Sequence, residues 1–433
     1  MKSSSIPRSH HFATPVWGTD FTRTFITATL PSLLAPGNIP FLGNRGSVYK
    51  IFTDTDGENE IRSSSAFAAL SRHVEVQFRP ITKVDANPYI ASSSCYRTAT
   101  IEAAAAQALI YYLIPDMILA DGSMRSISQS LEQGKRAVMV AGMRVAKDSF
   151  VNEVLRAFRS GDSVVAPPRD LVAVALKHLH PMMRNHMYDD AGESFNPSLF
   201  CWPVAGEGYV LRCAHLHPVA LDLQGQRPDL HGTIDDDLLF DLGLTEGELA
   251  FADDSDGVLW FELSDVNRTI PASSGKRLWE ILRWLNDSTY SHQREYLKKT
   301  LRVHVAEVTE KKWIEVEARA DQVIQTVLSA YELEKHRINH APDKYALPTP
   351  LHIDGTGLSQ APGPLIEKLM QAMGAASITN AFIDALESRA HSFLAHSASR
   401  RLGNALIKRT VAKGLIVGAS ALRASLRLLN RRS

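Results

Sequence analysis

The first 150 or so residues alternate between short apolar segments typical of strands and longer segments with apolar residues at helical spacing. Strands that are apolar on both faces, with helices between them, are typical of a parallel sheet covered by helices. The sequence therefore predicts an α/β fold with a mixed, mainly parallel sheet flanked by helices. The strand-like segments are His11–Trp17, Ser47–Thr53, Val74–Ile81, Ala108–Ile114 and Gly134–Val145, and helix-like ones include Asp20–Leu34 and Cys95–Gln107.

Length and composition limit the classes of protein that the chain can represent. A chain of 433 residues exceeds the usual single domain. Its 47 basic and 47 acidic residues cancel, which argues against nucleic acid as a partner. The three cysteines, Cys95, Cys201 and Cys213, lack metal-like spacing and suit a reducing compartment. No signal-peptide segment and no membrane-spanning apolar stretch is present, so we expect a cytoplasmic protein.

Changes in composition along the chain predict four parts. Residues 10–265 hold the alternating segments and the candidate site, and form the expected main domain. Residues 266–340 mix charged and apolar residues in a helical pattern and predict a helical extension. Residues 341–364 are rich in proline and glycine, as linkers are, and residues 365–433 form a C-terminal segment.

Two carboxylates, Asp116 and Asp121, follow the apolar run that ends at Ile114. In a parallel sheet, ligands lie beyond the carboxyl ends of the strands. Carboxylate oxygens at that place can bind a divalent cation that neutralises a diphosphate. The alternative is structural, with a turn at Asp116 and a helix cap at Asp121. No dinucleotide-binding glycine motif or P-loop occurs, which disfavours a dinucleotide-binding Rossmann fold and an NTPase.

A second candidate site lies in Gly208–Leu223, which has the pattern of one strand carrying His215 and His217. Side chains two apart in a strand point to the same side, where two imidazoles can bind a metal or assist a leaving phosphate. The alternative is a pair of hydrogen-bonded, partly buried histidines. His178 and His180 lie in a predicted helix, in which residues two apart do not share a face, so we expect them to be structural.

The acidic segment Gly232–Leu239 carries Asp235 and Asp236. One of these carboxylates is a candidate general base or acceptor-positioning group, acting with His217. The alternative is a solvated loop or the start of a helix. Because catalytic groups converge on one crevice from several loops, we expect Asp116, His217 and Asp235 to line one cavity.

Residues 10–265 resemble the GT-A class of nucleotide-sugar glycosyltransferases. The opening "FATPVWGTDFTRTF" and the segment "YYLIPDMILADGS" match in form the base-binding loop and the Asp-x-Asp region of that class. Ile114 stands where the class has its first Asp, so only Asp116 matches the motif. The same stretch resembles an uncharacterised bacterial subgroup that shares "TPVWG", "SLLAPGN", "PD…DGS" and "HLHP…TIDDD".

The resemblance implies a hexosyltransferase-type glycosyltransferase with Mn²⁺ or Mg²⁺ on the donor diphosphate. It implies a metal set drawn from Asp116, His215 and His217. Either this metal or an arginine could neutralise the leaving group, and Arg97 and Arg144 flank the acidic strand. The candidate donor-binding residues are Thr14, Pro15, Val16, Trp17, Arg97, Asp116, Asp121 and Arg144.

The sequence thus predicts an enzyme that moves a sugar from a nucleotide diphosphate sugar to an envelope glycan, lipid or protein acceptor. One alternative is a non-catalytic binding protein that keeps the fold, which Ile114 would permit. Another is a metal-dependent hydrolase that uses His215, His217 and Asp235.

The C-terminal tail, residues 400–433, has nine Lys and Arg and no acidic residue. Apolar residues at three- and four-residue spacing, including Leu406, Leu415, Leu422 and Leu426, predict a basic amphipathic helix. Such a helix can lie on an anionic membrane surface, so we expect peripheral attachment to the inner face of the cell membrane. The alternative is a helix that packs on the protein's own body or on a second subunit.

Overall fold

The computed structural model describes residues 8–43, 46–81, 88–189, 194–228, 233–235, 238–268, 274–308 and 311–340. These residues belong to one compact unit, Met1–Pro342. The predicted linker 341–364 and the predicted amphipathic tail lie outside the described residues. Within the described residues, no helix combines the length and the apolar composition needed to cross a membrane.

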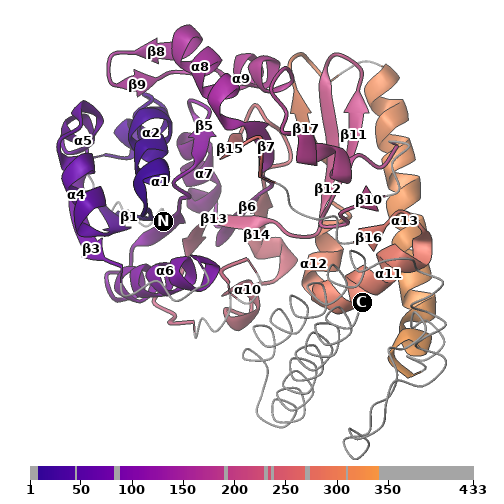
Figure 1. Ribbon diagram of the computed structural model, residues 1–433. Coiled ribbons are helices and arrows are strands. Elements are labelled where there is room, and N and C mark those ends of the chain that lie inside the picture. The colour runs from indigo at the N-terminus through magenta and orange to yellow at the C-terminus, as the bar shows by residue number, and fades with distance from the viewer. Residues whose placement is uncertain are drawn as a thin grey trace, which may run out of the picture. The chain divides into compact units, whose positions relative to one another are not determined.

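A seven-stranded sheet forms the centre of the unit, with the strand order β14-β6-β13-β4-β1-β2-β3 (Figure 1). Every pairing in this sheet is parallel except the two pairings that β13 makes with β4 and β6. The predicted fold class, a mixed and mainly parallel sheet flanked by helices, is confirmed. The strands are β1 (His10–Pro15), β2 (Val48–Thr53), β3 (Glu75–Pro80), β4 (Leu109–Tyr112), β6 (Ala137–Val140), β13 (His217–Asp222) and β14 (Leu249–Phe251).

Strand β4 shows how the sheet divides the hydrophobic core. Ile110 and Tyr112 belong to the core cluster that includes the inner face of α6 (Pro88–Ala105). Leu109 and Tyr111 belong to the cluster on the opposite face, because side chains alternate along a strand. Figure 1 shows α6 on one side of the sheet and α1, α2 and α7 on the other. The bounds of these three helices are α1 (Thr19–Thr24), α2 (Leu30–Leu33) and α7 (Ser123–Glu132), and a π-helical turn (Phe25–Thr29) joins the first two.

A three-stranded sheet lies beyond the carboxyl ends of β4 and β6. Its order is β5-β15-β7, with β5 (Met117–Leu119), β15 (Trp260–Ser264) and β7 (Met143–Ala146). Because β5 and β7 follow β4 and β6 after short connections, this sheet brings residues 116, 144 and 262 close to the edge of the central sheet. These positions carry charged side chains in the site described below.

A third sheet of order β11-β12-β17 packs with the long helix α13 around a separate aromatic core. Trp202 and Trp313 are fully buried there, together with Phe195 and Phe200. The elements are β11 (Leu199–Val204), β12 (Gly208–Cys213), β17 (Leu301–His304), α11 (Leu278–Ser288), α12 (Ser291–Tyr296) and α13 (Lys311–His340). The predicted helical extension 266–340 therefore also contributes a strand, β17, to a sheet. The division at residue 265 stays a prediction.

Two predicted elements are each divided in the structure. The single strand expected over Gly208–Leu223 is two strands in different sheets, β12 and β13, joined at residues 214–216. The helix expected over Pro168–Met187 is α9 (Pro168–Ala175) followed by the 3₁₀ helix Pro181–His186. Pro181 explains why the predicted helix does not continue from α9 into the 3₁₀ helix, since proline lacks an N–H group and disfavours helical geometry in the residue before it.

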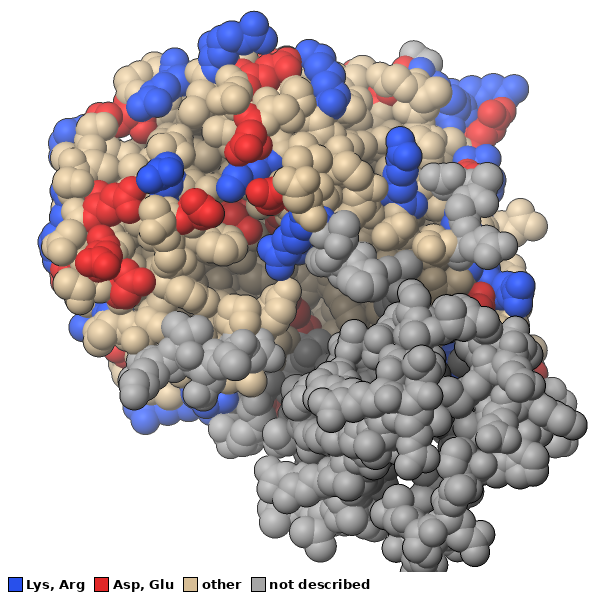
Figure 2. Space-filling view, in the orientation of Figure 1, with Lys and Arg blue, Asp and Glu red and all other residues tan. Residues whose placement is uncertain are grey.

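The remaining elements are short or peripheral. They comprise α3 (Ile39–Leu42), α4 (Thr55–Arg62), α5 (Ser65–Leu70), α8 (Lys147–Phe158), β8 (Arg159–Ser160), β9 (Ser163–Val164), β10 (Ser194–Phe195), α10 (Leu238–Asp241), a 3₁₀ turn at Glu246–Glu248 and β16 (Ser274–Gly275). Figure 2 shows basic and acidic side chains interspersed over the visible face of the described residues. This face has no continuous basic stripe of the kind that follows a nucleic-acid backbone.

Substitution of Gly208 by alanine is expected to lower the free energy of unfolding by about 3 kcal/mol, because an added Cβ would overlap a backbone oxygen. That oxygen belongs to Val303 of the paired strand β17, and Gly208 also has a φ of 147°. Urea unfolding of the G208A protein measures the loss. The control is G247A, where a Cβ would meet only the hydroxyl of Thr245 at 4.0 Å. Equal stability of the two variants would contradict the prediction.

Candidate active site

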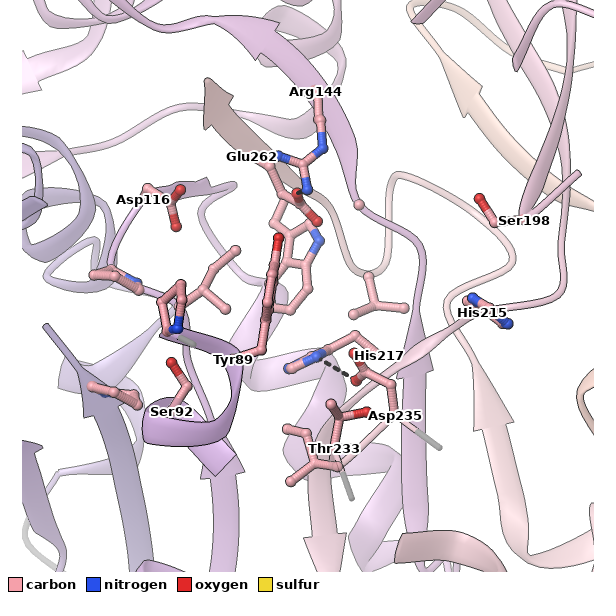
Figure 3. Close-up of a pocket in the computed structure, with 18 of the residues that line it drawn as sticks. Tyr89, Ser92, Asp116, Arg144, Ser198, His215, His217, Thr233, Asp235 and Glu262 are labelled. Atoms are coloured by element: carbon pink, nitrogen blue, oxygen red, sulfur yellow. Dashed lines mark hydrogen bonds and ion pairs between the residues drawn. The ribbon is translucent and has the colours of Figure 1, made fainter. Parts of the chain in front are cut away.

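A cavity of about 600 Å³ opens at the carboxyl ends of β1, β4 and β6 (Figure 3). Its volume lies within the roughly 300–1,000 Å³ that is usual for sites of small ligands. In Figure 3, Asp116 lies on one side, His217 and Asp235 on another, and Tyr89 between them. The lining comes from loops distant in the sequence, as expected for a site at this edge of a parallel sheet.

Seven of the predicted site residues line this cavity. The expectation that Asp116, His217 and Asp235 share one cavity is met, and they are joined by Pro15, Trp17, Arg144 and His215. Residues that the cavity lining does not include are Thr14, Val16, Arg97 and Asp121, and Asp236 lies outside the described residues. The functions proposed for the seven lining residues stay predictions.

The loop after β1 explains why only two of its four candidates reach the cavity. Thr14 and Val16 are fully buried, and the Thr14 hydroxyl hydrogen-bonds the hydroxyl of Tyr49 at 2.8 Å. Pro15 and Trp17 point the other way, to the cavity. Alternation along an extended segment produces this division.

Asp121 has a structural contact instead of a place in the cavity. Its Oδ1 accepts a hydrogen bond from the backbone N–H of Gly37 at 2.6 Å. The helix that follows, α7, is preceded by Gly122 and has no side-chain cap. Asp121 thus fixes the loop at Gly37 against the start of α7 and does not cap that helix, and its donor-binding role stays a prediction.

Asp116 is a carboxylate held in an unfavourable environment. Burial raises its pKa to about 6 from an ordinary value of 3.8, the charge of Glu262 adds to the rise, and Arg144 opposes it. Glu262 is itself engaged, since its carboxylate pairs with the Arg144 guanidinium at 2.7 Å. Arg144 also donates a hydrogen bond to the Ser264 hydroxyl at 2.9 Å. Strongly perturbed ionisation in a cleft marks a candidate functional group.

The D116N protein is expected to be more stable than the wild type at pH 8, by about 2 kcal/mol after allowance for partial exposure. The folded-state pKa of Asp116 is raised, so its protonated form stabilises the fold below the ordinary pKa. That stabilisation is lost as the pH rises from about 4 through about 6. Urea unfolding at pH 4 and pH 8 measures the difference between the proteins. A D116N protein that gains nothing at pH 8 would contradict it.

His217 is held as a charged imidazolium. Its Nε2–H donates to the backbone carbonyl of Tyr112 at 3.1 Å, and its Nδ1 lies 2.9 Å from a carboxylate oxygen of Asp235. Because both partners are acceptors, both ring nitrogens carry protons. Burial alone would lower the pKa of His217, but the charge and hydrogen bond of Asp235 raise it above its ordinary value. The ring also packs on Trp260, with centroids 5.0 Å apart.

The metal set predicted from Asp116, His215 and His217 stays a prediction, and the ring nitrogens of His217 have partners within the protein. A histidine binds a metal through a ring nitrogen that carries no proton, and His217 has none in this arrangement. His215 lies in the connection between two sheets, and its Nε2 lies 3.1 Å from the Ser288 carbonyl oxygen. Within the described residues, Asp116, His215 and His217 do not form a group whose ligand atoms lie within 4.8 Å of one another.

A candidate metal triad lies elsewhere in the described residues. Asp254, Asp256 and His304 each offer a ligand atom within 4.8 Å of the other two. None of the three lines the cavity. Arg169 already pairs with Asp256 at 2.6 Å, and His304 Nε2 lies 2.8 Å from Asp254. These contacts neutralise the acidic pair without an ion.

Three further cavity residues escaped sequence reasoning. Glu262 could have been found as an acidic residue in an otherwise apolar predicted strand. Arg268 belongs to no recognisable sequence motif, and only the fold shows that it lines the cavity. His186 was part of the predicted helix Pro168–Met187 and was not separated from His178 and His180. His178 pairs with Glu153 at 2.7 Å and His180 caps the 3₁₀ helix, and the structural role expected for these two stays a prediction.

Comparisons with known proteins give no family. No protein-family model matches the chain, and no curated protein matches it in sequence. A crystal structure of a protein described as a glucose-1-phosphate thymidylyltransferase from Bacillus anthracis, in complex with sucrose, aligns at 10% identity and a TM-score of 0.24. This alignment covers 33% of the present chain and 57% of the other, so the chain spans little more than half of the length of that protein.

A second structure, mouse xyloside xylosyltransferase 1 in its apo form, aligns at 12% identity and a TM-score of 0.27. The alignment covers 68% of the present chain and 97% of the xylosyltransferase. Similarities of this strength carry no conclusion about function, which must come from the site.

Proposed function

We propose that this protein is a transferase that moves a sugar from a nucleotide diphosphate sugar to a glycan, lipid or protein acceptor. One observation carries the proposal. Two arginines, the imidazolium of His217 and the carboxylate of Asp116, whose pKa is raised by burial, converge on one cavity at the carboxyl edge of a mainly parallel sheet. Departure of a diphosphate requires positive charge where negative charge develops, and fixed cations in a partly enclosed site supply it.

Arg268 and Arg144 are the groups that we assign to the donor diphosphate. The guanidinium of Arg268 lines the cavity and lies 3.5 Å from the hydroxyl of Tyr89, and in the described part of the chain it pairs with no carboxylate. Arg144 is tied to Glu262, so it also positions that carboxylate. A guanidinium forms paired hydrogen bonds with phosphate oxygens, which a metal would otherwise coordinate.

The remaining lining residues fit the other parts of a nucleotide sugar. Trp17 and Tyr89 offer aromatic faces to a base, and Asp116 offers carboxylate oxygens to sugar hydroxyl groups. His217, whose positive charge Asp235 supports, lines the cavity and can stabilise the negative charge that develops on the leaving phosphate. A metal-dependent hydrolase that uses His215, His217 and Asp235 is disfavoured, because both ring nitrogens of His217 and one ring nitrogen of His215 already face protein acceptors.

The experiment is a screen of UDP-, GDP-, dTDP- and ADP-sugars for release of nucleotide diphosphate by the full chain. One donor class should be consumed, and activity with EDTA should stay within about twofold of that with Mn²⁺, because fixed arginines replace the cation. Loss of activity in EDTA that Mn²⁺ restores would contradict the arginine assignment and favour a metal on Asp116. Tight binding of a donor without turnover would instead identify a binding protein.

A further inference from the structure

The cavity contains a third histidine, His186, which differs from His217 because only one of its ring nitrogens has a protein partner. His186 ends the 3₁₀ helix Pro181–His186, and its side chain lines the cavity. Its Nδ1 lies 3.1 Å from the carbonyl oxygen of Asn196 and 3.1 Å from that of Leu199. Carbonyl oxygens only accept, so Nδ1 carries the proton. In the neutral ring, Nε2 then has a free electron pair.

The Nε2 atom of His186 is open to the cavity. Within the described residues it has no hydrogen-bond partner, and it is not among the buried polar atoms that lack one. The backbone that holds Nδ1 is itself fixed, since Asn196 N–H donates to the Asn185 carbonyl at 2.7 Å and the Asn196 side chain accepts from Ser198 N–H at 3.2 Å. The ring is therefore held in one tautomer by the chain, and its other nitrogen is accessible on a residue that lines the cavity.

The surroundings of His186 keep the ring neutral. Burial lowers its pKa below the ordinary value, the positive charge of Arg144 on β7 lowers it further, and the two carbonyls and Glu262 on β15 oppose the shift. His217, by contrast, is held charged by Asp235. Among the three histidines that line the cavity, the surroundings thus shift the pKa values of His186 and His217 in opposite directions, as they do where two titratable groups have different roles.

We infer that His186 is the proton acceptor of this cavity and that its Nε2 takes the proton of the hydroxyl group that receives the sugar. This inference rests on the proposed function. As the acceptor oxygen bonds to the anomeric carbon, its proton passes to Nε2. The bond from that carbon to the diphosphate oxygen breaks, and the oxygen leaves with the bonding electrons. The proton on His186 then returns to water, so the enzyme is restored.

The state of His186 can be tested without any substrate. Diethyl pyrocarbonate acylates unprotonated, accessible imidazole nitrogens, and peptide mapping by mass spectrometry locates the modified histidines. At pH 6.5, His186 should react at least about tenfold faster than His217, because one has a free nitrogen and the other has none. His180 is an internal reference, since its Nε2 lies 2.7 Å from the Asp265 carbonyl and its Nδ1 accepts from Met182 N–H. An unreactive His186, or a His217 that reacts first, would overturn the inference.

The proton-acceptor role is tested with the H186Q protein. Its kcat for transfer should fall by about 10²-fold to 10⁴-fold, which is the usual contribution of a general base. The Kd for the donor sugar should change little, and the acidic limb of the wild-type pH profile should disappear. A kcat within threefold of the wild type would overturn the role. If the wild type consumes no nucleotide sugar, the proposed function fails, whereas the diethyl pyrocarbonate result still decides whether His186 is the neutral, open imidazole of the cavity.

Discussion

Replacement of Arg268 by methionine is expected to lower kcat/KM for sugar transfer by about 10²-fold to 10³-fold, as for the loss of one fixed donor to a developing anion. Methionine keeps much of the volume of the side chain and removes its charge. Arg268 suits this test because, within the described residues, it forms no ion pair with a carboxylate, although its charge acts on Asp116 from a distance. Removal of Arg144 would in addition leave Glu262 without its partner.

Two further variants, R268K and R169M, serve as comparisons for R268M. R268K should lie between wild type and R268M, because lysine keeps the charge but lacks the planar fork that binds two phosphate oxygens. R169M is the matched control, since Arg169 pairs with Asp256 and Glu307 and does not line the cavity. Donor titrations and initial rates on the four proteins measure the effects. An R268M protein with the donor affinity and turnover of R169M would remove Arg268 from the site.

Substitution of Asp235 by asparagine is expected to reduce kcat by about 10²-fold to 10³-fold at pH 7.5, the range for loss of one fixed group that stabilises a developing anion. The carboxylate holds the pKa of His217 above its ordinary value, so its removal lets His217 lose its proton at lower pH. The alkaline limb of the pH profile should therefore shift to lower pH in D235N. The His217 ring nitrogens, observed by ¹⁵N NMR, should show the same shift.

The same pair makes a pH-dependent contribution to stability. The pKa of His217 is raised in the folded protein, so the stabilisation is complete below the ordinary pKa and is lost as the pH rises through the raised value. The wild type should exceed D235N in stability at pH 6 and lose that advantage in alkaline solution. Identical pH profiles for activity in wild type and D235N would contradict the assignment of His217 as the charged imidazole.

The central sheet could be predicted because its signal is local. Each buried strand of the first half carries a continuous apolar run, and the helices between them follow from apolar spacing. Asp116 could be placed in the cavity for the same reason, since a residue shortly after a buried parallel strand lies at the ligand edge. The roles of such residues stay predictions, because the sequence places a carboxylate without giving its partners.

The two histidines show where local reasoning ends. The pattern over Gly208–Leu223 alternates like one strand, but the chain leaves one sheet at Cys213 and enters another at His217. His215 and His217 therefore reach the cavity from a connection and a strand start, and their ring nitrogens meet Ser288 and Tyr112, which are distant in sequence. No spacing rule within the segment contains those partners.

Asp121 and His186 show that contacts with distant parts of the chain decide what a side chain can do. Asp121 was a candidate donor-binding residue because of its sequence neighbours, but its carboxylate accepts a hydrogen bond from the backbone N–H of Gly37. His186 looked like one more helical histidine, but the segment from Asn196 to Leu199 fixes its tautomer and leaves its other nitrogen free. In each case a backbone group from another part of the chain decides what the side chain can do.

The central claim is that this cavity binds a nucleotide diphosphate sugar through fixed arginines, and calorimetric titration of the full chain with UDP-, GDP-, dTDP- and ADP-sugars in EDTA tests it most directly. One donor class should bind at one site per chain with a Kd on the order of micromolar, about −8 kcal/mol. That binding should be weakened by R268M and unchanged by R169M. Absence of binding by all four classes, or binding that R268M leaves intact, would contradict the account.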